Sequence, residues 1–160
     1  MKIIDNFIDN ADIVNDIQST LLGNNFPYFY NNHISEPGDN SDFLFGHMLF
    51  HDEDVKSNYF NKILSPILGR LDFNYLIRAK INCYTKKEKH IETGMHVDMN
   101  EKHLVALYSV NTNNGYTLFE DGTRVKSIAN QMAIFDGRLK HCSVSQTDKN
   151  LRLNININLL

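Results

Sequence analysis

Apolar and polar residues alternate most regularly in two segments, with the two-residue period of a β-strand. In FNYLIRAKINCY one face carries Phe73, Tyr75, Ile77, Ala79, Ile81 and Cys83, and the other carries Asn74, Leu76, Arg78, Lys80, Asn82 and Tyr84. In RLNININL the apolar face is Leu153, Ile155, Ile157 and Leu159, opposite Arg152, Asn154, Asn156 and Asn158. A sheet with one side in water would explain either strand alone. Both strands are also explained if their apolar sides pack under helices while their polar sides line a cavity that holds a polar ligand.

The first half of the chain predicts two amphipathic helices. The first spans residues 10–23, with Asn10 as N-cap, Gly23 as the end, and one apolar face formed by Ile13, Val14, Ile17 and Leu21. The second spans 55–71 and is expected to kink or split near Pro66. Short strands are predicted at KIIDNF and FLFGHMLF, and FPYFY is expected to be extended before a polar loop.

After residue 72 the pattern changes to short strands separated by turn residues. The predicted strands are 73–84, 94–98, 103–110, 116–119, 123–127, 131–136, 141–145 and 151–159, with turns at NTNNG, EDG and FDG. Many short strands behind two helices favour a mainly β fold, a double-stranded β-helix (jelly roll) with the N-terminal helices packed on one sheet. We expect one domain over 1–160, with a helical and extended part at about 1–72 and the jelly-roll core at about 73–160.

Composition narrows the classes of partner. The formal net charge of −3 over 160 residues gives no basic footprint for nucleic acid. Asp5, Asp9 and Asp12 near the start suit neither a signal peptide nor a transit peptide, and no apolar run approaches the roughly 18 residues of a membrane helix. Cys83 and Cys142 make no disulfide framework, so a reduced cytoplasm is the expected location.

A candidate metal site begins with His96 and Asp98 in TGMHVDMN. In an extended segment residues i and i+2 point the same way, about 6.5–7 Å apart, so both side chains can reach one ion. We predict His141 as the third ligand, because it follows the strand NQMAIFD and a tight turn and opens the next strand. Two imidazoles and one carboxylate form the facial set of non-haem Fe(II) oxygenases, which leaves the opposite side of the ion open. His103 is the competing ligand.

Arg152 stands 11 positions after His141, at the start of the strand whose polar face is predicted to point inward. A guanidinium facing a cavity requires an anion, and a carboxylate provides a bidentate partner. An exposed arginine would be the ordinary expectation, but the asparagine face and the preceding His-x-Asp…His set favour the inward one.

Together, HVD at 96–98, His141 and Arg152 resemble the His-x-Asp…His…Arg pattern of the Fe(II)/2-oxoglutarate-dependent oxygenases. The segments INCY, HVDMN and LYSVNTNNGYTLFEDG are similar to its prolyl-hydroxylase-like branch, and IIDNFI followed by a helix and FPYFY is similar to small phage-encoded and marine bacterial members. The resemblance implies Fe(II) at His96, Asp98 and His141, 2-oxoglutarate on the metal with its far carboxylate on Arg152, and O₂ as oxidant. It also implies hydroxylation of a substrate with release of succinate and CO₂.

The same resemblance suggests supporting residues for 2-oxoglutarate. Tyr84 matches a tyrosine that hydrogen-bonds the co-substrate, and Asn82 lies on the same predicted face. Thr117 is a further candidate. Asn154 completes an Arg-x-Asn pair that is also seen in the nucleic-acid-demethylating, AlkB-like branch. That branch usually has a second arginine where Asn158 stands here.

Two other classes of function stay open. One is a cupin-like metal-dependent isomerase or hydrolase with the same three ligands, which needs no inward arginine. The other is a non-catalytic jelly-roll binding module. For an oxygenase we expect a peptidyl proline, another side chain or a small metabolite as substrate rather than nucleic acid, no membrane partner, and a monomer or weak homodimer. The expected location is the cytoplasm, the host's if the protein is phage-encoded. Residues 24–42 and 85–95 are predicted to flank the mouth of the site.

Overall fold

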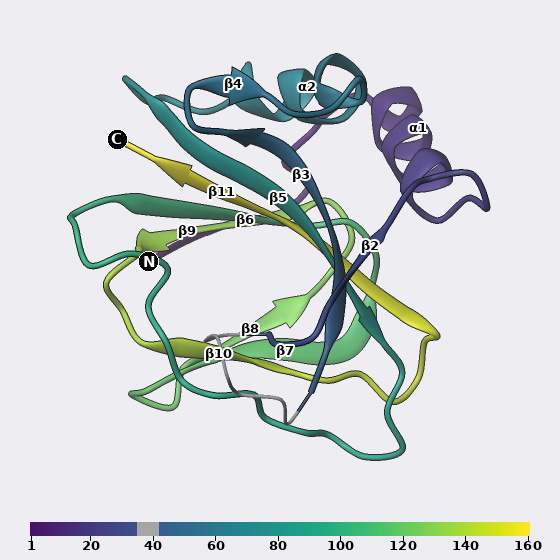
Figure 1. The fold of residues 1–160 in the computed structure, drawn as a ribbon, viewed down its shortest axis with the longest axis vertical. Helices are drawn as coiled ribbons and strands as arrows, with labels where there is room; N and C mark the ends of the chain where they lie inside the picture. Colours follow the sequence, from purple (N-terminus) through teal and green to yellow (C-terminus); the bar gives the residue numbers. More distant parts are fainter. Residues whose placement is uncertain (35–41) are drawn as a thin grey trace.

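Two antiparallel sheets make up most of the fold (Figure 1). The computed structural model describes residues 1–34 and 42–160. The strands of the large sheet follow the order β1-β9-β6-β11-β5-β3-β2, with β4 paired to β3, and the small sheet has the order β10-β7-β8. The bounds of the large-sheet strands are β1 Lys2–Ile4, β2 Phe29–Asn31, β3 Leu44–His51, β4 Asp54–Val55, β5 Leu76–Thr85, β6 Leu104–Ser109, β9 Gln131–Asp136 and β11 Leu151–Leu159. Those of the small sheet are β7 Asn113–Phe119, β8 Arg124–Ser127 and β10 His141–Val144. The predicted mainly β fold is confirmed.

The first helix, α1 (Ala11–Leu21), begins where its cap was predicted. The Asn10 side chain accepts hydrogen bonds from the backbone N–H groups of Asp12 and Ile13, at 2.9 and 3.4 Å, which satisfies donors that the first helical turn leaves free. Ile17 and Leu21 are fully buried against the large sheet. The sequence therefore determined both the start and the buried face of this helix.

The second predicted helix, 55–71, is wrong in its extent. Val55 belongs to β4, and only a π-helical turn over Phe60–Leu64 and the short α2 (Ser65–Leu68) are helical. The split before Pro66 was expected, since proline lacks the N–H that continues a helix. The preceding residues have other partners: the Ser57 hydroxyl accepts a hydrogen bond from the Tyr59 backbone N–H and also contacts His47.

The main core lies between the large sheet and the helices. Figure 1 shows α1 and α2 together on one side of the large sheet and the small sheet on its other side. The four apolar residues predicted for 152–159 all belong to this core, together with Ala79, Ile81 and Cys83 of β5. Their polar neighbours therefore point away from the helices, toward the small sheet, as the two-residue alternation predicts.

The alternation predicted for β5 fails at its first residues. Along the β11–β5 pairing, Arg78 lies opposite Asn158 but Leu76 lies opposite Leu159, so Ile77 is an extra residue. Such a bulge exchanges the faces of the residues before it, and Leu76 packs against the core instead of belonging to the polar face.

Two other boundaries differ from the prediction. Residues 94–98 do not form a strand; this part of the chain makes only isolated bridges to β10, at His96–His141 within the segment and at Glu92–Val144 just before it. The predicted turn at 111–115 is shorter, because β7 already begins at Asn113. Among the described residues, no helix is long and apolar enough to cross a membrane.

Candidate functional site

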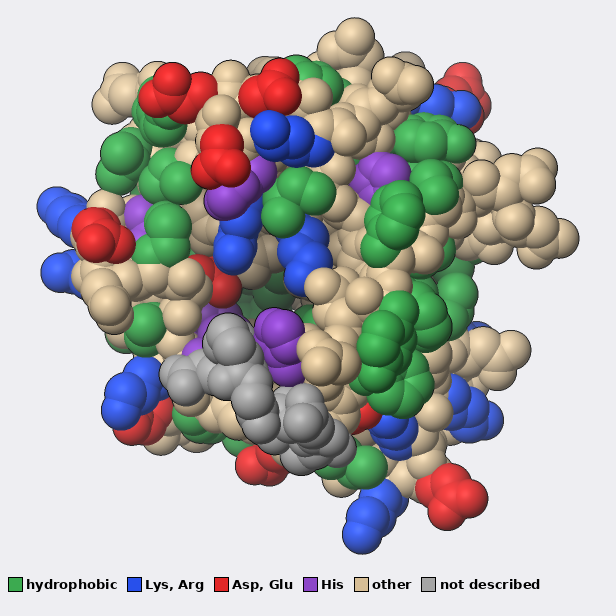
Figure 2. Space-filling view, viewed as in Figure 1, with side chains coloured by type: hydrophobic (Ala, Val, Ile, Leu, Met, Phe, Trp, Pro, Cys, Tyr) green, Lys and Arg blue, Asp and Glu red, His purple; other side chains and the backbone are tan. Residues whose placement is uncertain are grey.

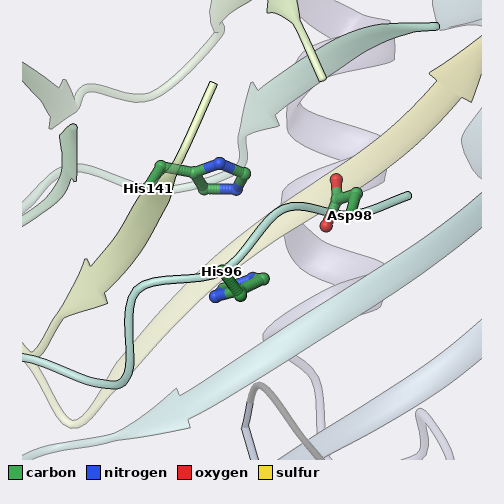
Figure 3. Close-up of side chains that lie close together, drawn as sticks. All are labelled: His96, Asp98 and His141. Carbon is green, nitrogen blue, oxygen red and sulfur yellow. The ribbon is translucent and has the colours of Figure 1, made fainter. Parts of the chain in front are cut away.

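His96, Asp98 and His141 lie together between the two sheets. One ligand atom from each side chain can be chosen such that all three lie within 4.8 Å of one another. Figure 3 shows the side chains converging, His96 and Asp98 from the irregular segment after β5 and His141 from β10. No other such group of His, Cys, Asp and Glu occurs in the described part of the chain.

Backbone pairing brings the two histidines together. The N–H of each donates to the carbonyl of the other at 3.0 Å, and residues paired in this way present their side chains on the same face. The imidazole centroids are 4.9 Å apart. Each Nδ1 also lies close to a backbone carbonyl, Gly94 at 3.0 Å for His96 and Leu139 at 2.8 Å for His141. A carbonyl only accepts, so each Nδ1 carries the proton and each Nε2 keeps its lone pair for a metal ion.

Asp98 is held by polar groups of β11 and β5. The side-chain amides of Asn156 and Asn158 donate to its Oδ2 at 3.0 and 3.1 Å, and an Arg78 guanidinium nitrogen lies 3.7 Å from its Oδ1. Burial acts to raise the pKa of Asp98, but these hydrogen bonds and the charges of Arg78 and His141 outweigh it, so the pKa is lowered overall. The carboxylate is ionised at neutral pH, as a metal ligand must be.

His141 is buried against aromatic rings. Its centroid lies 5.7 Å from that of Phe119 and 5.3 Å from that of Phe135. Burial lowers the pKa of His141, and the hydrogen bond to Leu139 and the charge of Asp98 offset this only partly. The imidazole is therefore neutral at pH 7 and able to bind a cation.

Arg152 crosses from the large sheet to the small one and is only 2% exposed. Its guanidinium donates to hydroxyls on each strand of the small sheet: Ser127 at 2.8 Å, Ser143, and Thr117 at 3.3 Å. It also lies 5.1 Å from the ring centroid of Tyr84. Within residues 1–34 and 42–160 it forms no ion pair. Burial lowers its pKa, yet a guanidinium stays protonated, so the charge lacks a counterion among the residues that the structure describes.

Gly115 makes room for this arginine. A Cβ at residue 115 would lie 2.9 Å from Arg152 Cδ, from Asn113 Oδ1 and from the Val144 carbonyl oxygen. All three contacts are closer than real Cβ atoms allow, and one of them is backbone. The glycine lies where the β7–β8 register shifts, between Asn113 and Tyr116.

A single cavity of about 250 Å³ joins the three candidate ligands to Arg152. The other predicted site residues, namely Tyr84, Asn82, Thr117 and Asn154, all line it. Asn82 donates to Asn154 at 3.0 Å, so these two amides form a pair on the wall. Figure 2 shows a hollow on this face of the molecule, with histidine, acidic and basic side chains around it.

His103, the competing ligand, is not part of the cluster. It is 3% exposed, its Nδ1 is 2.8 Å from the Glu101 carbonyl oxygen, and its ring occupies the space that a side chain at Gly137 would need. His103 Nε2 has no hydrogen-bond partner among the described residues.

Sequence reasoning missed several residues around the site. The hydroxyls of Ser127 and Ser143 were not recognised, although Ser143 follows His141 by two positions in one strand and so shares its face. Arg78 was assigned to the polar face of its strand, but its position next to Asp98 was not predicted. Of the predicted mouth segment 24–42, Asn31, His33 and Ile34 line the cavity, and residues 35–41 lie outside the described part of the structure.

Comparison with solved structures identifies the fold. A Pseudomonas putida prolyl-4-hydroxylase is 10% identical, with a TM-score of 0.66 over 99% of this chain and 90% of that chain. A viral collagen prolyl hydroxylase of Paramecium bursaria Chlorella virus 1, in a 2-oxoglutarate complex, is 11% identical, with a TM-score of 0.60 over 99% and 95%. The chain has the fold of the 2-oxoglutarate/Fe(II) oxygenases.

A third structure with this oxygenase fold is a Trichoplax adhaerens prolyl hydroxylase in complex with a peptide fragment of hypoxia-inducible factor. It is 13% identical, with a TM-score of 0.62 over 99% of this chain and 82% of that chain. The sequence matches no protein-family model and no curated protein. The likeness is therefore one of fold, and the chemistry has to be argued from the site.

Proposed function

We propose that this protein is an Fe(II)- and 2-oxoglutarate-dependent dioxygenase that hydroxylates a substrate with release of succinate and CO₂. One observation carries the proposal: a two-histidine, one-carboxylate cluster shares a cavity with a buried arginine that has no counterion among the described residues. The cluster suits a divalent metal with open positions, and the arginine suits a dicarboxylate.

The donor set agrees with Fe(II). His96 and His141 direct protonated Nδ1 atoms to carbonyls and keep Nε2 for the ion, while Asp98 keeps Oδ1 as its less engaged oxygen. When bound, Fe(II) and 2-oxoglutarate would together reduce O₂, one oxygen atom passing to succinate and the other to the substrate C–H bond. The protein's part is to hold, orient and shield these groups.

The far carboxylate of 2-oxoglutarate is assigned to Arg152. The guanidinium is anchored by hydroxyls on three strands, so it is already ordered before any ligand arrives. Thr117 and Tyr84 border the same end of the cavity and are proposed to contact the co-substrate. Asn82 and Asn154 are proposed to contact its middle, because their paired amides line the cavity and Asn154 lies on β11 between Arg152 and Asn156, which holds Asp98.

Apolar side chains also line the cavity, and we propose that they limit the access of water to the metal ligands. Leu107 and Phe135 line the cavity, and Phe135 also packs edge-on against His141. Excluding water strengthens the electrostatic contacts inside and protects reactive species from side reactions.

The substrate is proposed to be a protein side chain, including peptidyl proline, or a small metabolite. The peptide seen with the Trichoplax prolyl hydroxylase and the collagen prolyl hydroxylase activity named for the viral protein support a peptidyl substrate. The net charge of −3 disfavours nucleic acid.

The experiment is an anaerobic titration with Fe(II) and 2-oxoglutarate, followed by oxygen. We expect a metal-to-ligand charge-transfer band and then slow formation of succinate. His96→Ala should abolish both signals, and His51→Ala, at a partly exposed histidine outside the cavity, should change neither. Succinate formation by His96→Ala at the wild-type rate would refute the ligand assignment.

Arg152→Met separates the proposal from its rivals. A cupin-like isomerase or hydrolase with the same metal ligands would bind metal and keep its activity without the guanidinium. A non-catalytic binding module would form no succinate at all. An oxygenase should bind metal normally but bind 2-oxoglutarate far more weakly and form little succinate.

A further inference from the structure

The cavity contains more positive charge than the proposed co-substrate needs. Its described lining includes three basic side chains, Arg78, Lys80 and Arg152, and one acidic side chain, Asp98. With Fe(II) and 2-oxoglutarate bound, the two positive charges of the metal and the one of Arg152 balance the three negative charges of Asp98 and the dicarboxylate. Among the described lining residues, Arg78 and Lys80 then have no negative charge to balance them.

Arg78 is already engaged by the protein. Its Nε donates to Asn158 Oδ1 at 2.9 Å, and its guanidinium lies 3.7 Å from the Asp98 carboxylate. Arg78 therefore stabilises the Asp98 carboxylate, and its side chain also lines the cavity.

Lys80 is different, because its ammonium group makes no hydrogen bond or ion pair with any residue that the structure describes. Its stem runs across Gly46 of β3: a Cβ at residue 46 would lie 2.7 Å from Lys80 Cε and 3.2 Å from the side-chain nitrogen of Asn31. Because Gly46 has no side chain, the Lys80 side chain can lie across β3 at this position. The side-chain amide of Asn31, which can also donate a hydrogen bond, lies next to it.

The position is unfavourable for a cation. Burial, followed by the charge of Arg78, lowers the pKa of Lys80, and the more distant Asp98 offsets this only in part. A half-buried ammonium next to a guanidinium is stabilised when an anion joins them.

We propose that the substrate carries an anionic group, a carboxylate or a phosphate, and that Lys80 binds this group at the cavity mouth with Arg78 adding to the positive field. The inference rests on the proposed function, because it assigns Arg152 to the co-substrate. It narrows the substrate to molecules or side chains that present an anion near the C–H bond to be oxidised.

The test is a backbone-amide NMR titration with two separate probes, inorganic phosphate and acetate. Each is added to the free protein and to protein loaded with Zn(II) and 2-oxoglutarate. Loading should shift Thr117 and Ser143 at the arginine end. The probes should then shift Gly46 and Ile81, which flank the lysine. If Zn(II) and 2-oxoglutarate do not shift the amide signals of Thr117 and Ser143, the proposed co-substrate site is wrong. The titration of the free protein then still tests whether the probes bind near Lys80.

Variants make the assignment specific. Lys80→Met should weaken probe binding at the Gly46 end at least tenfold, and Lys80→Arg should retain it. Gly46→Ala should also weaken it, because the new methyl group displaces the ammonium while leaving the charge. Lys126→Met, at an exposed lysine of β8, is the matched control and should bind the probes as wild type does.

The probe with the higher affinity identifies the source of the anion. If phosphate binds more tightly than acetate, the substrate is expected to carry a phosphate group. If acetate binds more tightly, the substrate is expected to carry a carboxylate. The inference is overturned if neither probe shifts Gly46 and Ile81, or if Lys80→Met binds the probes with wild-type affinity.

Discussion

Gly115→Ala is the most direct perturbation of the arginine end of the cavity, since it changes no charge and removes no hydrogen-bonding group. The added methyl carbon would lie 2.9 Å from Arg152 Cδ, from Asn113 Oδ1 and from the carbonyl oxygen of Val144. The carbonyl belongs to β10 and cannot rotate away, so either the β7–β10 pairing opens slightly or the arginine stem moves.

The size of the effect follows from overpacking, which costs typically 1–3 kcal/mol. For a chain of this length a loss of about 2 kcal/mol lowers Tm by roughly 4–8 °C. A displaced guanidinium would also lose a charge-assisted hydrogen bond to 2-oxoglutarate, worth about 1.5–3 kcal/mol. Affinity for 2-oxoglutarate should therefore fall by at least about tenfold, at roughly 1.4 kcal/mol per factor of ten.

The assay combines thermal unfolding with calorimetric titration of 2-oxoglutarate and, separately, of Mn(II). Mn(II) affinity should not change, because the three metal ligands lie at the other end of the cavity. Gly69→Ala is the control: a Cβ there would meet only the Ser65 carbonyl oxygen at an ordinary 3.5 Å. If Gly115→Ala melts and binds 2-oxoglutarate as wild type does, the close packing described around Arg152 is wrong.

Three further predictions concern the cavity and the core. Arg152→Met should weaken 2-oxoglutarate binding about a hundredfold in calorimetry while leaving Mn(II) binding intact; equal losses of both would mean that the fold had changed. Mn(II) at a hundred times its Kd should stabilise the protein by about 2.7 kcal/mol, a rise in Tm of roughly 5–11 °C, and His96→Ala should remove this rise. Burial raises the pKa of Cys83 to about 11 from 9.0, so the folded state keeps a proton that the unfolded state loses, and stability should fall between about pH 9 and 11. In Cys83→Ala, denaturant titrations over this range should show a shallower fall, and an unchanged slope would contradict the assignment.

The features that the sequence predicted well are those that depend on one local pattern. The alternation of residues 152–159 predicts both a core face and a cavity face, and Asn10 predicts the start of α1. The bulge at Ile77 was not predictable, because it reflects how β5 pairs with β11 and not the composition of β5. The same holds for residues 55–71, where pairing of Val55 with β3 replaced a helical pattern that the side chains alone would support.

The site shows a similar division. His96, Asp98 and His141 could be selected because few residue types bind metals and their spacing is compatible with one sheet face. Of the partners of Arg152, Ser127 and Ser143 were not selected, because serine is a common residue and its role at these two positions arises only when two sheets are stacked. Lys80 and Gly46 likewise become neighbours only through the β3–β5 pairing.

Strand β11 carries two unrelated duties on one stretch of nine residues. Every second side chain packs in the hydrophobic core. Of the intervening ones, Arg152, Asn154 and Asn156 line the cavity, and Asn158 donates a hydrogen bond to Asp98. A one-residue insertion or deletion here would exchange the two sets, so structure and chemistry would be lost in the same step. Substitutions in β11 can therefore change the cavity without disturbing the fold, but insertions and deletions cannot. Changes of length that alter substrate specificity are expected in the loops around the cavity mouth.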